Sequence, residues 1–338
     1  MTVLDQLPQG ARVAIVRLRS LGDCVLTTPA IGLLNRARPD LAIGVVVEER
    51  FRAVFEGNPA VNQILPPAWP AVRQWRPTLC VNLHGGTRSQ WITALSGAPW
   101  RAGFAHHNTT LAYNIKIPRA QKILHVQRTV HTAEHMASAF FALGVPLQDV
   151  PRAQLFAGEP LESAKGADAR RQTARDVARS SGGALDTAPV LREFLVKGKY
   201  AVLHPFASAP DKQWRAERFC EVARYLSLWN IKPVFLAGPQ DSVGAFREHQ
   251  VAQGSLNEAK ALLSKAAAFI GNDSGPAHVA AAFGTPSVVL FGSSNPAIWG
   301  PWQTEAEIVV APDGLKQVSV SRVIAALERL RIVEEAHA

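Results

Sequence analysis

The sequence predicts an α/β protein with two doubly wound, parallel-sheet domains that face one another across a cleft. Short apolar runs alternate with helical patterns along most of the chain, which is typical of parallel strands joined by right-handed crossovers. Two such series occur, one in each half. A charged, alanine-rich and then glycine-rich stretch separates them at residues 158–199.

Length and composition are consistent with two separate cores. The chain has 338 residues, of which 47% are hydrophobic and 19% charged. We expect an N-terminal domain at residues 1–160 and a C-terminal domain at residues 200–338. The connector between them, residues 161–199, is expected to hold one exposed helix and a loop.

In the N-terminal half, apolar runs and helical periodicity predict alternating strands and helices. The predicted strands are residues 13–18, 43–47, 63–65 and 79–83. The predicted helices are residues 29–38, 50–56, 89–95 and 133–143.

The C-terminal half repeats this alternation. The predicted strands are residues 201–204, 234–237, 269–271, 288–291 and 308–310. The predicted helices are residues 216–229, 242–252, 257–267, 276–283 and 320–330. Neither half has a GxGxxG motif after its first strand, which disfavours an enzyme that uses nicotinamide or flavin.

The ends and the cysteines of the chain indicate a cytoplasmic protein. The opening MTVLDQLPQGAR lacks the basic start and apolar run of a secretory signal, and no stretch approaches 18 uninterrupted apolar residues. Cys24, Cys80 and Cys220 are odd in number and widely spaced, so neither a disulfide framework nor a zinc site is indicated.

The net charge of +9 is concentrated in residues 57–133, which contain no Asp or Glu. The cations of this segment are Arg73, Arg76, Arg88, Arg101, Lys116, Arg119, Lys122 and Arg128. Such a region predicts an anionic partner, either a membrane face or an acidic glycolipid, and the alternative is a solvated surface. We expect no nucleic acid, because no helix-turn-helix, zinc finger or RNP-like motif is visible.

Residues 271–284, GNDSGPAHVAAAFG, predict a strand, a polar turn and a helix whose first turn binds an anion. The N–H groups of a helix start and its positive dipole end favour phosphate, and Ser274 and His278 are placed to add hydrogen bonds. The alternative is an ordinary helix capped by Asp273 or Ser274, with His278 as a satisfied polar residue.

A second polar loop follows the predicted strand at 201–204. Its sequence, HPFASAPDKQW, places Ser208 and Lys212 four residues apart, and a hydroxyl with an ammonium suits a diphosphate. A solvated lysine is the alternative. Because both loops follow strands of one parallel sheet, a shared ligand crevice is expected at the carboxyl ends of the strands.

Together, HPFASAPDKQW and GNDSGPAHVAAAFGTPSVVLFG resemble the donor half of glycosyltransferase family nine, the ADP-heptose:lipopolysaccharide heptosyltransferases. The segment LRSLGDCVLTTPAIGLLNRARP resembles the opening of the same family, and NLHGGTRS and AGPQDS lie where the family has related turns. The resemblance spans most of the chain and is weakest at residues 148–199.

This resemblance implies the GT-B architecture of two Rossmann-like domains, with the acceptor on the N-terminal domain and the nucleotide sugar on the C-terminal one. The implied reaction is an inverting, metal-independent transfer of heptose from ADP-heptose to the inner core of a lipopolysaccharide precursor. The resemblance also implies that the reaction takes place at the inner face of the inner membrane.

The resemblance assigns the catalytic base to Asp23. The competing interpretation is that Asp23 only caps the helix that follows. Thr28 followed by Pro29 offers a later helix start, which would leave Asp23 free on a loop.

For the donor, the resemblance implies that Ser208 and Lys212 contact the pyrophosphate, and that the turn Asp273, Ser274 and Gly275, with His278, contacts phosphate and sugar. Asp241 stands where an acid accepts the ribose hydroxyls, although it can equally cap the predicted helix at 242–252. The family's adenine-facing segment falls at residues 254–256. One hydroxyl of the family's pair before the lysine is missing here, since Ala207 precedes Ser208.

Arg19 and Arg88 are the candidate acceptor contacts, because both should follow strands at the edge of the cleft. Either can instead be a surface arginine with a packed stem. No cofactor is implied, and no metal is expected, since the sequence has neither a DxD motif nor a cluster of acids. Two further hypotheses stay open, a nucleotide-sugar epimerase of the GT-B type and a non-catalytic glycolipid- or nucleotide-binding protein.

Overall fold

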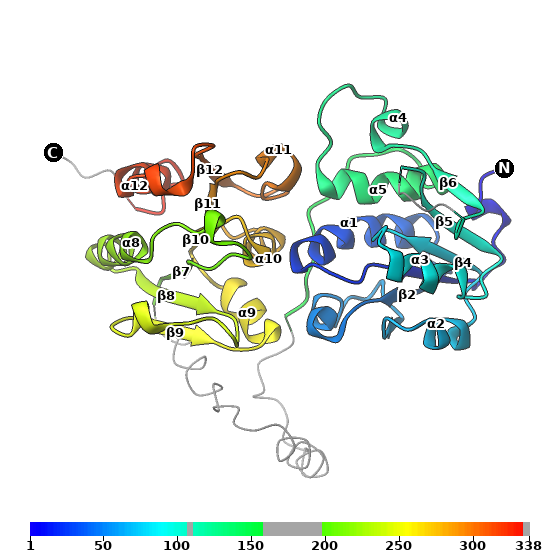
Figure 1. The fold of residues 1–338 in the computed structure, drawn as a ribbon, viewed down its shortest axis with the longest axis horizontal. Helices are drawn as coiled ribbons and strands as arrows, with labels where there is room; N and C mark the ends of the chain where they lie inside the picture. The colour runs from blue at the N-terminus through cyan, green and yellow to red at the C-terminus, as the bar shows by residue number, and fades with distance from the viewer. Residues whose placement is uncertain (107–110, 158–197, 334–338) are drawn as a thin grey trace, which may run out of the picture.

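The structure, a computed structural model, describes residues 1–106, 111–157 and 198–333. These residues form two lobes that lie side by side, with the N-terminus and the C-terminus at opposite outer ends (Figure 1). The predicted connector at 161–199 falls almost entirely outside the described residues, so its helix and loop stay predictions. No helix among the described residues is long and apolar enough to cross a membrane.

The N-terminal lobe is built on a six-stranded parallel sheet in the order β3-β2-β1-β4-β5-β6. Its strands are β1 (Arg12–Val16), β2 (Ala42–Val46), β3 (Gln63–Leu65), β4 (Leu79–Asn82), β5 (Trp100–Phe104) and β6 (Ile115–Ile117). Its helices are α1 (Leu21–Ala37), α2 (Trp69–Trp75), α3 (Thr87–Ala94), α4 (Ala120–Leu124) and α5 (Thr132–Leu143), with 3-10 turns η1 (Leu4–Gln6) and η2 (Glu49–Val54). The strand order reverses between β1 and β4, where such sheets open a crevice.

The C-terminal lobe repeats this topology in the order β12-β11-β10-β7-β8-β9, again with parallel strands. Its strands are β7 (Tyr200–His204), β8 (Lys232–Ala237), β9 (Gln250–Gln253), β10 (Ala268–Asn272), β11 (Ser287–Phe291) and β12 (Ala306–Val310). Its helical segments are η4 (Pro210–Lys212), α8 (Ala216–Leu228), η5 (Gly244–Phe246), α9 (Leu256–Leu263), α10 (Gly275–Phe283), α11 (Pro296–Trp299), η6 (Leu315–Gln317) and α12 (Val320–Arg329). The predicted pair of doubly wound sheets is confirmed.

The predicted helix start at residue 29 is wrong. Helix α1 begins at Leu21 and continues through Pro29, which is buried. A proline inside a helix leaves the carbonyl four residues earlier without its donor. Here the Thr28 hydroxyl donates to that carbonyl, Val25 O, at 2.8 Å, so the helix runs on without a break.

The predicted helix at 242–252 is also wrong. The chain there forms the short turn η5 and then strand β9, which pairs with β8 at the sheet edge. The Gln253 side chain fixes this edge, because its Nε2 donates to Gly238 O at 2.9 Å and to Asp241 O at 3.0 Å. The predicted helix at 50–56 is the 3-10 turn η2, and strands β5 and β6 were not predicted.

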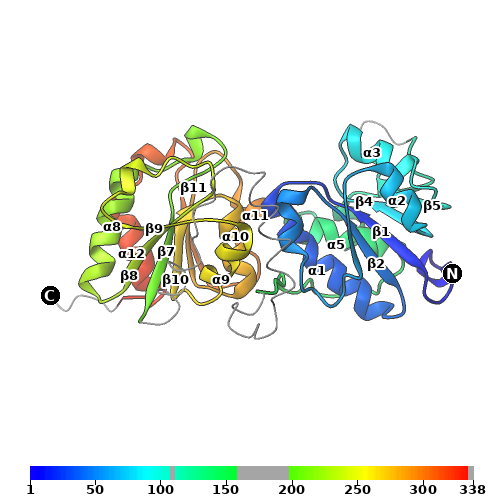
Figure 2. The same ribbon diagram turned by 90° about the horizontal axis from the view of Figure 1, so that it is seen from below.

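One continuous apolar core joins the two lobes. Helices α1 and α5 of the first lobe and α9 and α10 of the second fill the space between the facing sides of the two sheets (Figure 2). Smaller cores lie on the outer sides, under α2 and α3 in one lobe and under α8 and α12 in the other. An apolar contact of this kind favours one relative placement of the lobes.

Polar contacts support one edge of this junction. Lys260 on α9 is 1% exposed, and its Nζ donates to Ala53 O of η2 at 2.6 Å. Asn257 Nδ2 donates to Glu56 Oε2 at 3.1 Å beside it. Burial lowers the pKa of Lys260, while nearby Glu56 opposes the shift, so this cation belongs to the packed junction and not to the surface.

Candidate active site

A cavity of about 410 Å³ lies where the two lobes meet. It is lined by Ser20, Leu21, Gly22, Asp23, Ser208, Lys212, Asp273, Ser274, Gly275, His278 and Trp299. Seven of the ten site residues predicted from the sequence are in this lining, and they come from both lobes. The predicted crevice at the carboxyl ends of β7 and β10 is therefore formed, and residues that follow β1 in the other lobe line it as well.

The C-terminal wall of the cavity is the start of α10. Ser274 is the N-cap residue in extended conformation, but its side chain makes no capping hydrogen bond. Its Oγ is buried and has no hydrogen-bond partner among the described residues, and the same holds for His278 Nδ1 one turn further along the helix. A buried polar atom without a partner costs about 1–3 kcal/mol, so both atoms are suited to receive a ligand. The alternative of Ser274 as an ordinary cap is wrong.

Lys212 is the last residue of the turn η4 and lines the cavity beside the start of α10. Its Nζ lies 3.3 Å from Asp273 Oδ2, and the Ser294 hydroxyl donates to the same oxygen at 2.5 Å. Ser208 lines the cavity from the same loop as Lys212. Both members of the ion pair are largely buried, the lysine at 29% and the aspartate at 10% exposure. The lysine is therefore placed in the cavity and is not a solvated surface cation.

Asp23 faces α10 from the start of α1. Its Oδ2 accepts hydrogen bonds from Ser20 N at 3.4 Å and from Ser20 Oγ at 3.0 Å, so the two residues form a capping box. Asp23 therefore lies in the first turn of a helix and not on a free loop. The two interpretations of this residue are compatible, since the carboxylate that caps α1 also lines the cavity.

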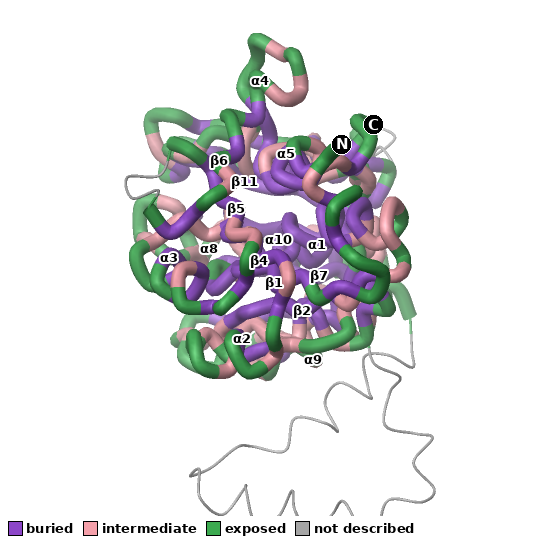
Figure 3. The backbone as a smooth tube through the Cα atoms, turned by 90° about the vertical axis from the view of Figure 1, so that its right-hand side faces the viewer, coloured by how far each residue is buried: buried purple, intermediate pink, exposed green. Residues whose placement is uncertain are grey.

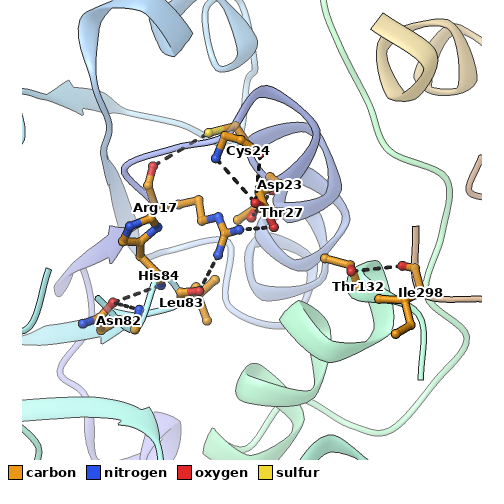
Figure 4. A network of polar contacts seen from close by, with 11 residues as sticks. Arg17, Asp23, Cys24, Thr27, Asn82, Leu83, His84, Thr132 and Ile298 are labelled. Carbon is orange, nitrogen blue, oxygen red and sulfur yellow. Dashed lines mark hydrogen bonds and ion pairs between the residues drawn. The ribbon is translucent and has the colours of Figure 1, made fainter. Parts of the chain in front are cut away.

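Arg17, at the end of β1, holds the other oxygen of this carboxylate. Its Nη2 forms an ion pair with Asp23 Oδ1, and its Nη1 donates to Leu83 O at 2.6 Å (Figure 4). Arg17 is 5% exposed, and within the described part of the chain its buried Nε has no hydrogen-bond partner. No role was predicted for Arg17 from the sequence. An arginine inside the apolar run of a buried strand is unusual and could have indicated a functional residue.

Two glycines allow the starts of α1 and α10 to touch. A Cβ atom at Gly22 would lie 2.5 Å from His278 Cδ2, and one at Gly275 would lie 2.7 Å from the Leu21 side chain. No side chain fits at either position without displacing its neighbour. Gly22 precedes Asp23, so this contact brings the carboxylate of one lobe beside the helix start of the other.

His278 is the buried imidazole at this contact. Desolvation lowers the pKa of His278 to about 4, although the Asp273 and Asp23 charges oppose the shift. The ring is therefore neutral at pH 7. A neutral imidazole offers one donor and one acceptor, which lets it contact a sugar hydroxyl or a phosphate oxygen without repelling the cations nearby.

Three predicted site residues lie outside the cavity lining. The Asp241 carboxylate accepts a hydrogen bond from Gly238 N at 2.7 Å within its own turn, and it does not cap the turn η5 that follows, whose N-cap residue is Val243. Arg88 donates to Pro67 O at 2.9 Å and lies 3.7 Å from Glu48. Arg19 is exposed and adjoins the lining residue Ser20. Their ligand contacts stay predictions.

Comparisons with known proteins identify the family of this chain. A family model described as glycosyltransferase family 9 (heptosyltransferase) matches residues 69–324, more than half of the chain. Lipopolysaccharide heptosyltransferase 1 of Pseudomonas aeruginosa is 25% identical over 317 residues, which cover 86% of this chain and 81% of the relative.

Solved structures share the fold over nearly the full length. A family 9 glycosyl transferase from Veillonella parvula has a TM-score of 0.74 and 25% identity, covering 95% of this chain and 97% of its own. ADP-heptose lipopolysaccharide heptosyltransferase II of E. coli has a TM-score of 0.74 at 19% identity, covering 96% and 100%. The predicted GT-B architecture is confirmed, and the chain belongs to glycosyltransferase family 9 and is a glycosyltransferase.

Proposed function

We propose that this enzyme transfers a heptose from ADP-heptose to the inner core of a lipopolysaccharide precursor, with inversion at the anomeric carbon and without a metal ion. Family membership supports the heptosyl transfer, and the names of the P. aeruginosa and E. coli relatives support the donor and the acceptor. The observation that carries the proposal is one cavity with the Asp23 carboxylate on one wall and an uncapped helix start with Lys212 on the other.

The donor diphosphate is proposed to lie between Lys212 and the start of α10. The N–H groups at the start of α10, to which Pro276 adds none, and the dipole of this helix favour an anion, and Ser274 Oγ has a hydrogen bond to give. Lys212 contacts the Asp273 carboxylate and would instead pair with phosphate when the donor binds. Ser208 supplies a further hydroxyl from the same loop, and His278 faces phosphate or sugar.

Asp23 is proposed to act as the general base. It takes the proton from the acceptor hydroxyl as that oxygen attacks the anomeric carbon, opposite the bond to the leaving diphosphate. One C–O bond forms while the other breaks, ADP leaves with the electron pair, and the configuration inverts. Arg17 and Ser20 fix both carboxylate oxygens, so the base is held in one orientation toward the cleft.

The N-terminal domain, residues 1–160, is proposed to bind the acceptor, and residues 200–338 to bind the donor. Lys116, Arg119 and Lys122 are exposed on and around α4, which stands out from the body of the lobe (Figure 3). Cations of this kind near an anionic membrane contribute about 1 kcal/mol each. We propose that this face contacts the inner membrane, where the glycolipid acceptor is presented.

Vesicle flotation tests the membrane contact. The protein should float with phosphatidylglycerol vesicles and remain below neutral phosphatidylcholine vesicles. Replacing Lys116, Arg119 and Lys122 by serine should abolish flotation. Equal flotation with both vesicle types would contradict an electrostatic contact.

Calorimetric titration tests the donor, and a turnover assay tests the reaction. ADP should bind more tightly than UDP or GDP, and ADP release from ADP-heptose should require a lipopolysaccharide acceptor.

The product linkage, read by NMR, should have the anomeric configuration opposite to that of the donor, and EDTA should leave turnover unchanged. A preference for UDP, or loss of turnover with EDTA, would overturn the nucleotide or the metal-independent part of the proposal.

The same assays separate the two alternatives. An epimerase would convert the donor without any acceptor and without net release of ADP. A binding protein would take up ADP without turnover. Acceptor-dependent ADP release excludes both.

A further inference from the structure

Trp299 is the one aromatic residue among the described residues that line the cavity, and the sequence alone predicted no role for it. It is the last residue of α11, it is half-buried, and it packs against the core that joins the lobes. It lines the same cavity as Asp23 and His278. A partly exposed indole beside phosphate-binding groups and a carboxylate is an apolar surface in an otherwise polar site.

The position of Trp299 in the fold places it on the donor side. Strands β7, β10 and β11 are neighbours in one parallel sheet. The segment after β7 carries Ser208 and Lys212, the turn after β10 carries Ser274, and the segment after β11 carries Trp299. Three consecutive strand ends therefore supply the hydroxyl and ammonium, the helix start and the aromatic surface of one wall.

The backbone around Trp299 is held by the other lobe. Thr132 Oγ1 donates to Ile298 O at 3.0 Å (Figure 4). His131 Nδ1 accepts from its own helix start, so its Nε2 carries the proton and donates to Gly300 O at 2.9 Å. The residues on both sides of Trp299 are thus fixed, and a fixed aromatic residue loses little entropy when a ligand packs on it.

We propose that Trp299 is a stacking residue for the donor sugar, with the indole packed against the C–H face of the heptose ring of ADP-heptose. This inference rests on the proposed function. The sugar must lie between the diphosphate, held by Lys212 and α10, and the acceptor hydroxyl near Asp23. Trp299 borders that space. A pyranose presents C–H groups on one face, and these suit the electron-rich face of an indole while its hydroxyls reach polar groups such as His278.

Calorimetry with two ligands tests this role. ADP lacks the sugar and ADP-heptose carries it, so a residue that touches only the sugar changes the affinity for one and not the other. Trp299→Ala should weaken ADP-heptose binding about tenfold and leave the ADP dissociation constant within about twofold. Trp299→Phe keeps an aromatic face and should retain ADP-heptose affinity within about threefold. Trp91→Ala is the matched control, because Trp91 on α3 is 62% exposed and outside the cavity lining, and it should change neither affinity.

Each contrary result points to a different error. Equal weakening of ADP and ADP-heptose by Trp299→Ala would mean that the indole shapes the cavity without touching the sugar, and the inference would be wrong. Unchanged ADP-heptose affinity, or a change in the KM of the acceptor alone, would also overturn it. A wild-type protein that binds neither ligand would overturn the proposed function first, and this inference with it.

Discussion

Helices α1 and α10 both start at a serine, but the two serines differ in their hydrogen bonding. Each follows a buried parallel strand and starts at a serine in extended conformation, Ser20 or Ser274. Ser20 contacts Asp23 within its own capping box, whereas the buried Ser274 hydroxyl has no partner in the part of the chain that the structure describes. The first helix start is satisfied by its own side chains, and the second is left for a ligand.

This difference decides where negative charge belongs in the cavity. The positive end of α1 is already occupied by the Asp23 carboxylate, which Arg17 also contacts. The positive end of α10 has no acid in its first turn. A diphosphate therefore fits at α10, and the carboxylate facing it from α1 remains available to accept a proton.

Replacing the carboxylate on α1 should have the largest effect. Asp23→Asn keeps the size of the side chain but cannot accept the acceptor's proton, so turnover should fall about 10³-fold. ADP affinity should stay within about twofold, because the diphosphate binds to the other wall. Single-turnover kinetics and calorimetry measure the two quantities.

Ser20→Ala is the control for this change, since it removes a contact to Asp23 and leaves the carboxylate in place. Its turnover should fall far less than that of Asp23→Asn. If Asp23→Asn retained a tenth of wild-type turnover, Asp23 would be a cap and not the base.

The buried imidazole on α10 should make the protein sensitive to acid. The pKa of His278 falls from 6.5 to about 4 on folding, so the unfolded chain binds the extra proton between these values. The stabilisation is complete above pH 6.5 and is lost as the pH falls toward 4, a total of about 3 kcal/mol in the free energy of unfolding. Urea unfolding across this range measures it.

His278→Gln should flatten this pH dependence, because the glutamine has no proton to take up. The buried His131 and His204, whose pKa values are also lowered by desolvation, contribute in the same direction, so part of the slope should remain. An identical slope in His278→Gln would show that this ring is not the buried neutral group described above.

Removing the ammonium of Lys212 should lower the affinity for ADP and have little effect on the fold. Lys212→Met keeps the apolar stem and loses the charge, so ADP affinity should fall about 30-fold, the range of a charge-assisted hydrogen bond. The salt dependence of ADP binding should become shallower. Lys265→Met, an exposed lysine of the same lobe, should bind ADP as the wild type does. An unchanged ADP affinity in Lys212→Met would place the diphosphate elsewhere.

The sequence predicted the C-terminal wall of the cavity better than the N-terminal one. Lys212, Ser274 and His278 all belong to segments that follow strands of one sheet, Lys212 in η4 after β7 and the other two at the N-cap and in the first turn of α10 after β10, where local pattern and position in the fold agree. Asp23 was expected on a loop because Pro29 is typical of a helix start. The hydrogen bond from the Thr28 hydroxyl to Val25 O, which lets the helix continue through Pro29, is visible only in the structure.

The residues that were missed depend on contacts between distant segments. Arg17 gains its role from Asp23 on the next helix and from Leu83 at the end of β4. Gly22 matters because His278, from the other lobe, lies against it. Neither pairing has a periodicity or spacing that a single sequence reveals. The strand at 250–253 was missed for a similar reason, since the sheet edge and the Gln253 contacts override the helical pattern.

The smallest predicted effect compares the two helix starts directly, through the same substitution. Ser20→Ala removes a capping residue and should lower the free energy of unfolding by about 1 kcal/mol. Ser274→Ala removes a buried hydroxyl that has no partner among the residues described, so the free energy of unfolding should be unchanged or raised by up to about 1 kcal/mol. ADP affinity should fall about fivefold in Ser274→Ala, the value of one hydrogen bond, and stay unchanged in Ser20→Ala. Urea unfolding with and without ADP measures both quantities. Equal losses of stability in the two variants would mean that Ser274 caps α10 after all, and α10 would then have no open end to offer a phosphate.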